Sequence, residues 1–122
     1  MVEFAVCMPL LSILALGSVE VSNAIFLKQA LVTSSYEGAC QAVKATSTTA
    51  AAEAAANKCL TFRNVRNATI VISPGSVEAV ARGQQIRVTV SAPLSGNSPF
   101  IGRIIANRTL SASTTMVKEK LP

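Results

Sequence analysis

The sequence predicts an α+β protein with a long N-terminal helix, the first half of which crosses a membrane, followed by a short helix and a small antiparallel β-sheet of three to four strands. Three observations lead to this fold class. Residues 4–27 contain one charged residue, Glu20, and no Lys or Arg. Residues 50–58 are rich in Ala. The second half of the chain holds short stretches in which Val, Ile and Thr recur, which is typical of strands.

The apolar N-terminal stretch is long enough to span a bilayer. At about 1.5 Å per helical residue, its two dozen positions cross the roughly 30 Å of a hydrocarbon core. The helical pattern continues beyond Lys28, so we expect one helix that runs to about Lys44. Its second half carries an apolar stripe that we expect to pack on the domain: Val32, Tyr36, Ala39, Cys40 and Val43. The chain then divides into a transmembrane stem helix, residues 1–27, and a small α+β domain, residues 28–122.

The elements of the domain follow from local patterns. Residues 45–49 offer several Ser and Thr caps, and the Ala-rich residues 50–58 form a second helix or continue the first. Strands are predicted at residues 68–73, 85–92 and 110–117. In the second of these, Ile86, Val88 and Val90 point inward. Residues 77–82 form a short helical turn or an edge strand.

The connection at residues 93–109 has an unusual composition for a loop, because four large apolar residues lie between positions 100 and 105, beside Arg103. Three roles stay open for this stretch. It contacts the membrane surface, it contacts a partner protein, or it covers the sheet.

Three interpretations compete for the N-terminus: a cleaved signal peptide, a plain single-pass anchor, and a pilin-like stem. A signal peptide starts with a basic region, whereas this chain starts with Met-Val-Glu. The ordered residues Val2-Glu3-Phe4-Ala5, Pro9-Leu10-Leu11, Gly17, Glu20, Gln29-Ala30-Leu31 and Glu37-Gly38-Ala39 favour the third. This series resembles the TadE-like family of pseudopilins, from the tight adherence (Tad/Flp) branch of type IV pilus machinery. The resemblance covers about the first 40 residues.

The resemblance implies roles for residues at the start of the chain. Glu3, followed by Phe4, would serve in recognition by the prepilin peptidase and in pairing with the N-terminal amine of a neighbouring subunit. Precursors of such proteins carry a short basic leader that ends in Gly, with Glu as fifth residue of the mature chain. If Glu3 is that residue, the cleaved bond lies two positions upstream of Met1. At Cys40 the sequence departs from the family, which often has Arg there.

The candidate residues of the membrane stem are Pro9, Gly17 and Glu20. Gly17 belongs to the pattern that resembles the family, whereas Pro9 and Glu20 have physical consequences of their own. Pro9 removes one helix hydrogen bond, and Ser12 or a neighbouring subunit would satisfy the freed carbonyl. Glu20 allows two alternatives. It faces water at the outer membrane interface, or it lies buried and contacts another subunit, since a carboxylate in the bilayer costs about 2.5–3.5 kcal/mol unless it is paired.

The cysteines bear on the path of the chain. Cys7 lies in the apolar run and is expected to be an inert small hydrophobe. In one unbroken helix Cys40 and Cys59 would be about 28 Å apart, too far for a disulfide. A break near residues 46–49 would bring them closer. A disulfide between Cys40 and Cys59 and a pair of buried free thiols both stay open.

Composition excludes most other functions. The chain has no His and no Asp, and it has no Gly-rich phosphate loop and no CxxC pair, so we predict no enzyme, no cofactor and no metal site. The net charge of +5 comes from scattered residues without an aromatic platform, which argues against nucleic acid. No small-molecule substrate is expected. The predicted partners are the membrane, other pilin-like subunits and the pilus assembly machinery.

The resemblance therefore implies a minor pilin-like subunit or assembly factor of an adhesion pilus, acting by helix–helix packing. It also implies a single-pass inner-membrane protein with its C-terminal domain outside the cytoplasm, although counting Lys and Arg alone places the domain inside. The alternatives are a single-pass anchored binding or scaffold module unrelated to pili, and a small secreted domain behind a cleaved signal.

Overall fold

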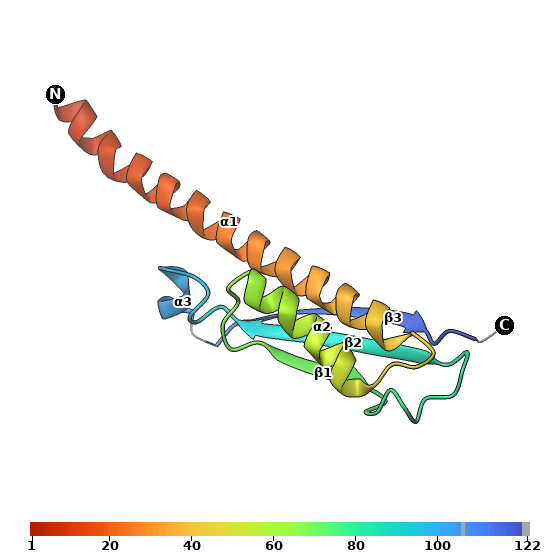
Figure 1. Ribbon diagram of the computed structural model, residues 1–122. Coiled ribbons are helices and arrows are strands. Elements are labelled where there is room, and N and C mark those ends of the chain that lie inside the picture. Colours follow the sequence, from red (N-terminus) through yellow and green to blue (C-terminus); the bar gives the residue numbers. More distant parts are fainter. Residues whose placement is uncertain (106, 121–122) are drawn as a thin grey trace.

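The computed structural model describes residues 1–105 and 107–120. The elements in order are α1 (Val2–Ala42), α2 (Thr49–Phe62), β1 (Thr69–Ser73), β2 (Gln85–Pro93), α3 (Ile101–Ile104) and β3 (Thr109–Val117). Figure 1 shows α1 as a long rod whose C-terminal half lies with α2 on one face of the sheet, while its N-terminal half extends away from the domain. The α+β class, the two helices and the small sheet agree with the prediction.

The sheet has three antiparallel strands in the order β1-β2-β3. β2 is central, with Val90 opposite Ile70 of β1 and Ala112 of β3. Ile86, Val88 and Val90 are fully buried, as their alternation predicts, because side chains on one face of β2 meet the helices while the next ones point away. The strands start and end within one residue of the predicted bounds.

α2 folds back antiparallel to α1. The helix therefore breaks in the stretch rich in Ser and Thr, where a break was predicted. α1 ends at Ala42, and Thr48 caps α2 by accepting a 3.2 Å hydrogen bond from the N–H of Ala51. The two helices pack closely through small residues. A Cβ added to Gly38 would lie 3.2 Å from the Cβ of Ala56 and 3.2 Å from Cγ1 of Val88, so Gly38 allows α2 and the sheet to approach α1 together.

The predicted apolar stripe of α1 is wrong at most of its positions. Of its five residues only Ala39 is buried, whereas Val32 and Tyr36 are 47% and 52% exposed. The buried face consists instead mainly of small and polar residues together with two leucines: Leu27, Ala30, Leu31, Ser34, Ser35, Gly38, Ala39 and Ala42. Ser34 donates to the carbonyl of Ala56 at 2.9 Å, so a hydroxyl is tolerated inside. The pattern misled because close helix packing selects for small side chains rather than large ones.

The end of the domain farthest from the stem, the far end, is closed by polar contacts. Residues 77–80 form a turn, which decides between the helical turn and the edge strand expected for this stretch. Glu78 accepts hydrogen bonds from the N–H and hydroxyl of Thr49, at 2.8 and 2.7 Å, and so sits at the N-terminus of α2. Lys118, 5% exposed, donates to the carbonyls of Val77 and Val80 at 2.6 and 3.1 Å.

Candidate functional site: the stem helix and its junction with the domain

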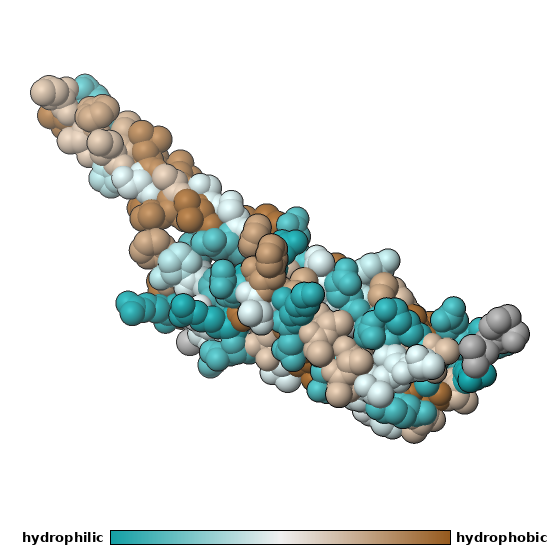
Figure 2. All heavy atoms as spheres, in the orientation of Figure 1, coloured by the Kyte–Doolittle hydropathy of each residue, from teal (hydrophilic) through white to brown (hydrophobic). Residues whose placement is uncertain are grey.

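The first half of α1 is bare, in the sense that the rest of the chain does not cover it. Residues 1–19 are all exposed, and the most apolar 18-residue window has a mean hydropathy of 2.0 with none of it buried in the chain. Among the described residues, α1 is the one helix long and apolar enough to cross a membrane. Nineteen residues extend for about 28 Å, close to the thickness of a hydrocarbon core. Figure 2 shows this bare rod as largely hydrophobic beside a more hydrophilic domain.

The expected assembly residues at the start of the stem lie on the exposed surface. Oε2 of Glu3 is 3.4 Å from the amine of Met1, and both groups are fully exposed. Phe4 is 65% exposed. Neither side chain touches the domain, so both are available to a neighbouring molecule or to lipid.

The helix continues through Pro9 without ending. Pro9 cannot donate to the carbonyl of Ala5. Ser12 does not replace that bond, because its hydroxyl donates at 2.9 Å to the carbonyl of Met8. Gly17 has no other atoms within 4 Å of the place where its Cβ would be, so the stem presents open space there. A second helix could approach α1 closely at this point.

Glu20 is the first residue of α1 that the domain buries. It is 4% exposed, so the expectation that its carboxylate faces water is wrong. Its oxygens accept hydrogen bonds from the hydroxyl of Ser98 and, at 2.6 Å, from the N–H of Phe100. Both partners lie in the connection between β2 and β3, some eighty residues further along the chain. We call this contact between Glu20, Ser98 and Phe100 the clasp, because it holds the connection against α1 at the point where the uncovered part of the helix ends.

The connection that meets Glu20 is held in shape by Asn97. Its amide donates to the carbonyls of Arg66 and Pro93 at 2.9 and 2.8 Å, and its Oδ1 accepts from the N–H of Arg66 at 2.8 Å. Gly96 has φ +87°, a left-handed conformation that favours Gly. The turn therefore presents Ser98 and Phe100 to α1. No local pattern along the chain indicates this pairing, apart from the apolar composition of residues 100–105.

Four large apolar residues form an outer ridge along α1 on the side turned away from the sheet: Val21, Ile25, Val32 and Tyr36. They are about half exposed, and their spacings of four, seven and four place them on one face of the helix. The neighbouring Cys40, mainly through its hydrogen bond, raises the pKa of Tyr36 above its ordinary 10.0, so the phenol stays neutral at physiological pH. The outer ridge continues the apolar surface of the stem over the domain.

The cysteines are free thiols in this structure, Cys7 exposed and the other two half-buried. Cys59 lies beside the part of α1 that precedes Cys40, because it lines a surface hollow together with Thr33 and Glu37. Of the two alternatives, the pair of free thiols fits this structure.

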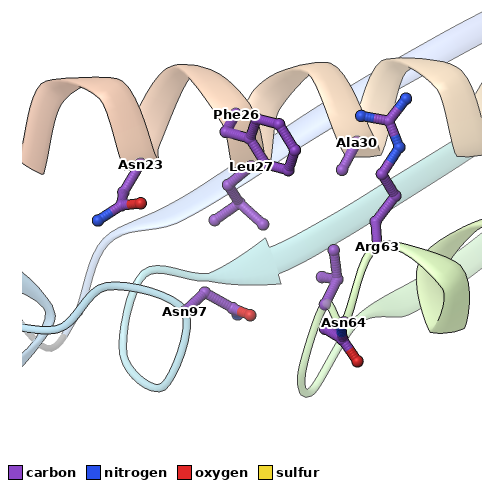
Figure 3. A pocket seen from close by; sticks show the side chains of 8 residues that line it. Asn23, Phe26, Leu27, Ala30, Arg63, Asn64 and Asn97 are labelled. Atoms are coloured by element: carbon purple, nitrogen blue, oxygen red, sulfur yellow. The ribbon is translucent and has the colours of Figure 1, made fainter. Parts of the chain in front are cut away.

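A small polar hollow lies beside the junction. It has a volume of about 80 Å³ and is lined in part by Asn23, Leu27 and Asn97. Figure 3 shows Asn23 and Leu27 on α1 above Asn97, with Arg63 beside Ala30. The Arg63 guanidinium is 5.5 Å from the centroid of the Phe26 ring, a cation–π contact that ties α2 to the stem. The hollow is much smaller than the roughly 300 Å³ of typical ligand pockets. No group of His, Cys, Asp or Glu in the described residues is arranged to hold a metal ion.

Comparison with known families finds one similarity, and it falls on this helix. Residues 1–39 match the family model of TadE-like proteins. The match covers about a third of the chain and ends three residues before α1 does. No curated protein and no solved structure gives a significant match to the chain. The N-terminal helix is therefore similar to that of TadE-like proteins, and it is long and apolar enough to cross a membrane.

The TadE-like match includes part of the face that packs on the domain. In Gln29-Ala30-Leu31 and Glu37-Gly38-Ala39, the residues Ala30, Leu31, Gly38 and Ala39 are buried, while Gln29 and Glu37 are exposed. The resemblance therefore reflects two kinds of constraint in one helix. The apolar stem suits a membrane, and the small residues after position 29 suit close packing against α2 and the sheet.

Proposed function

We propose that this chain is a minor pilin-like subunit or assembly factor of a Tad/Flp-type adhesion pilus, anchored in the inner membrane by α1 with its domain outside the cytoplasm. It acts by helix–helix packing rather than by catalysis. Its partners are other pilin-like subunits and the pilus assembly machinery. The observation that carries the proposal is that the TadE-like match falls on a helix whose residues 2–19 are left entirely uncovered by the domain.

Two further features support packing against other helices. Gly17 leaves open space on the stem, and close helix approach in membranes favours such small residues. The outer ridge extends the apolar surface beyond the stem, on a domain surface where it would otherwise face water. We therefore assign the stem and the outer ridge as the surface that meets neighbouring subunits. Glu3 and Phe4 are proposed to act in processing and in pairing at the membrane edge.

The proposal is tested in the cells that carry the gene. Deleting the gene should abolish or strongly reduce surface pili and adherence, and expression of the full chain should restore both. Val32→Lys places a charge on the outer ridge without touching the buried face of α1. A charge in an apolar contact costs more than the 1.4 kcal/mol that changes association about tenfold, so we expect complementation to fall by about tenfold or more.

The matched control is Val71→Lys, on β1. Val71 is 54% exposed, similar to Val32, but it lies on the sheet. This variant should complement normally. Unchanged pili in the deletion strain would overturn the proposal and leave the anchored binding module as the account of the chain. Normal pili with Val32→Lys would show instead that the ridge is not the contact surface.

A further inference from the structure

The end of the domain nearest the stem, the stem-side end, carries an exposed apolar tip. The tip consists of Phe100, Ile104 and Ile105, which are 54%, 83% and 43% exposed. In Figure 1, α3 lies at the end of the domain from which the bare half of α1 emerges. The N–H of Phe100 is bonded to Glu20 at 2.6 Å, so the tip is fixed to the helix rather than free to move away from it.

The position of that bond along α1 sets the depth of the tip. The bare residues 1–19 extend for about 28 Å, and a hydrocarbon core is about 30 Å thick. If α1 spans a bilayer, Glu20 therefore lies where the hydrocarbon ends and the head groups begin. The tip is then held at the head-group level, beside the stem.

Charge is distributed unevenly between the two ends of the domain. Five cations surround α1 just beyond Glu20 and form a basic collar: Lys28, Arg63, Arg66, Arg103 and Arg108. Contacts place each of them there. Lys28 donates to the carbonyl of Ser111, Arg66 is bonded to Asn97, and Arg63 stacks on Phe26. The carbonyl of Arg108 accepts from Leu94 at 2.9 Å, and Arg103 belongs to α3.

The acidic residues lie elsewhere. All six acidic residues are Glu, and they lie in the described part of the chain. Apart from Glu3 and the buried Glu20, three of them are at or near the far end, and Glu37 lies between the two ends of the domain. Glu37 lies seventeen residues beyond Glu20 on α1, about 25 Å along the helix. Glu53 follows Ala52, whose carbonyl faces Gly38; Glu78 binds Thr49; and the N–H of Glu119 donates to Val43. Among the described residues, Glu37 is the exposed acid that approaches the basic collar, where it shares a hollow with Arg63, so the five cations of the collar leave it with a net positive charge.

We propose that the apolar tip and the basic collar form a second membrane contact, which binds the surface of a bilayer that contains anionic phospholipids. The apolar side chains enter the boundary between head groups and acyl chains, and the cations attract the lipid phosphates. The clasp between Glu20, Ser98 and Phe100 couples this contact to the stem and fixes how the domain sits on the membrane. The inference requires that α1 spans a bilayer, but it requires no pilus component.

The chain contains no Trp, so a single substitution gives a specific fluorescent reporter. Phe100→Trp places the reporter on the tip, and Tyr36→Trp places a comparison reporter on α1, about 24 Å beyond Glu20 along the helix. Full-length variants are reconstituted in phosphatidylcholine vesicles, with and without phosphatidylglycerol. Lipids brominated near the head group then quench any Trp at the membrane surface. Flotation after a carbonate wash confirms that α1 is inserted.

We expect bromolipid to quench Trp at position 100 several-fold more than Trp at position 36, and we expect phosphatidylglycerol to increase the difference. Added salt should reduce that increase, because salt screens the exposed cations. The double substitution Arg103→Gln with Arg108→Gln in the Phe100→Trp chain should remove the dependence on phosphatidylglycerol. The matched pair at the far end, Lys44→Gln with Arg82→Gln, should not.

Ser98→Ala tests the clasp, because it removes the hydroxyl that donates to the buried Glu20 carboxylate while the N–H of Phe100 still binds that carboxylate. It should lower the quenching at position 100 and leave the far end unchanged. Equal quenching at positions 100 and 36 in inserted protein would overturn the inference while leaving the proposed pilus function untouched. Quenching at position 100 that ignores phosphatidylglycerol would refute the role of the basic collar. Loss of the chain from the vesicles on carbonate washing would refute the membrane span on which both contacts depend.

Discussion

Gly38 offers the sharpest test of how α1 packs on the domain. A Cβ at this position would meet Ala56 and Val88 at 3.2 Å, and the Ala52 carbonyl at 3.5 Å. The Ala56 contact is with a short side chain that moves only with the backbone of α2. Gly38→Val adds three carbons to this space. Overpacking of this kind costs about 1–3 kcal/mol, which exceeds the few tenths that Val gains over Gly in helix propensity.

Gly38→Ala is the closer case, and its expected outcome differs. It gains about 1 kcal/mol of helix propensity and meets the two carbons at a distance that requires a small shift of α2. We therefore expect its stability to stay within about 1 kcal/mol of the parent protein. The control is Gly17→Val on the bare stem, where nothing lies within 4 Å and the domain is not touched. That variant should leave the stability of the domain unchanged.

The assay is urea unfolding of the full chain in detergent micelles, followed by circular dichroism. With a slope of about 1 kcal/mol per molar urea for a small domain, Gly38→Val should lower the midpoint by about 1 M or more. A Gly38→Val midpoint equal to that of the parent would refute the close approach of α1, α2 and β2. So would a loss in Gly17→Val as large as that in Gly38→Val, because it would show that the stem is not separate from the domain.

Three further predictions concern groups outside the stem. The pKa of Glu78 is lowered from its ordinary 4.5 mainly by the hydroxyl and N–H of Thr49. This contact therefore stabilises the fold above about pH 5, and the stabilisation is lost as the pH falls through the lowered pKa. In thermal unfolding, Glu78→Gln should lose less stability on acidification than the parent protein does. Lys118→Met removes both hydrogen bonds of a buried cation and should destabilise by about 1.5–3 kcal/mol in the urea assay, and an unchanged midpoint would contradict their role. Cys40 and Cys59 should both react with an alkylating reagent in unreduced, unfolded protein, and a mass consistent with a bond between them would mean that α2 packs in another register.

Much of the fold was predictable because each element has a local signal. The stem is a long run with a single charge, and β2 alternates cleanly between buried and exposed positions. The break between the helices is marked by the Ser and Thr residues of which Thr48 becomes the cap. These signals come from neighbours within a few positions, so they can be read along the chain.

The candidate site was less predictable because its contacts join distant parts of the chain. Glu20 was expected to meet either water or another subunit, yet its partners Ser98 and Phe100 lie in a connection for which contact with the stem helix was not among the expected roles. The direction of α1 was also misread. Large side chains such as Val32 and Tyr36 suggested the core, but the close approach at Gly38 leaves space only for small residues. The apolar residues were thereby left on the outer surface, where we propose that they meet a neighbouring subunit.

The central claim is that the stem and the outer ridge pack against neighbouring subunits, and cysteine crosslinking in native membranes tests it most directly. The three native cysteines are replaced by Ala, and single cysteines are placed at Ile25 on the ridge or at Val71 on the sheet, two sites with the same 54% exposure. A disulfide between chains requires the two Cα atoms to come within about 7 Å. The account predicts that the Ile25 site crosslinks to another pilin-like chain under mild oxidation while the Val71 site does not. Absence of any crosslink at the ridge, in membranes of cells that are making pili, would contradict it.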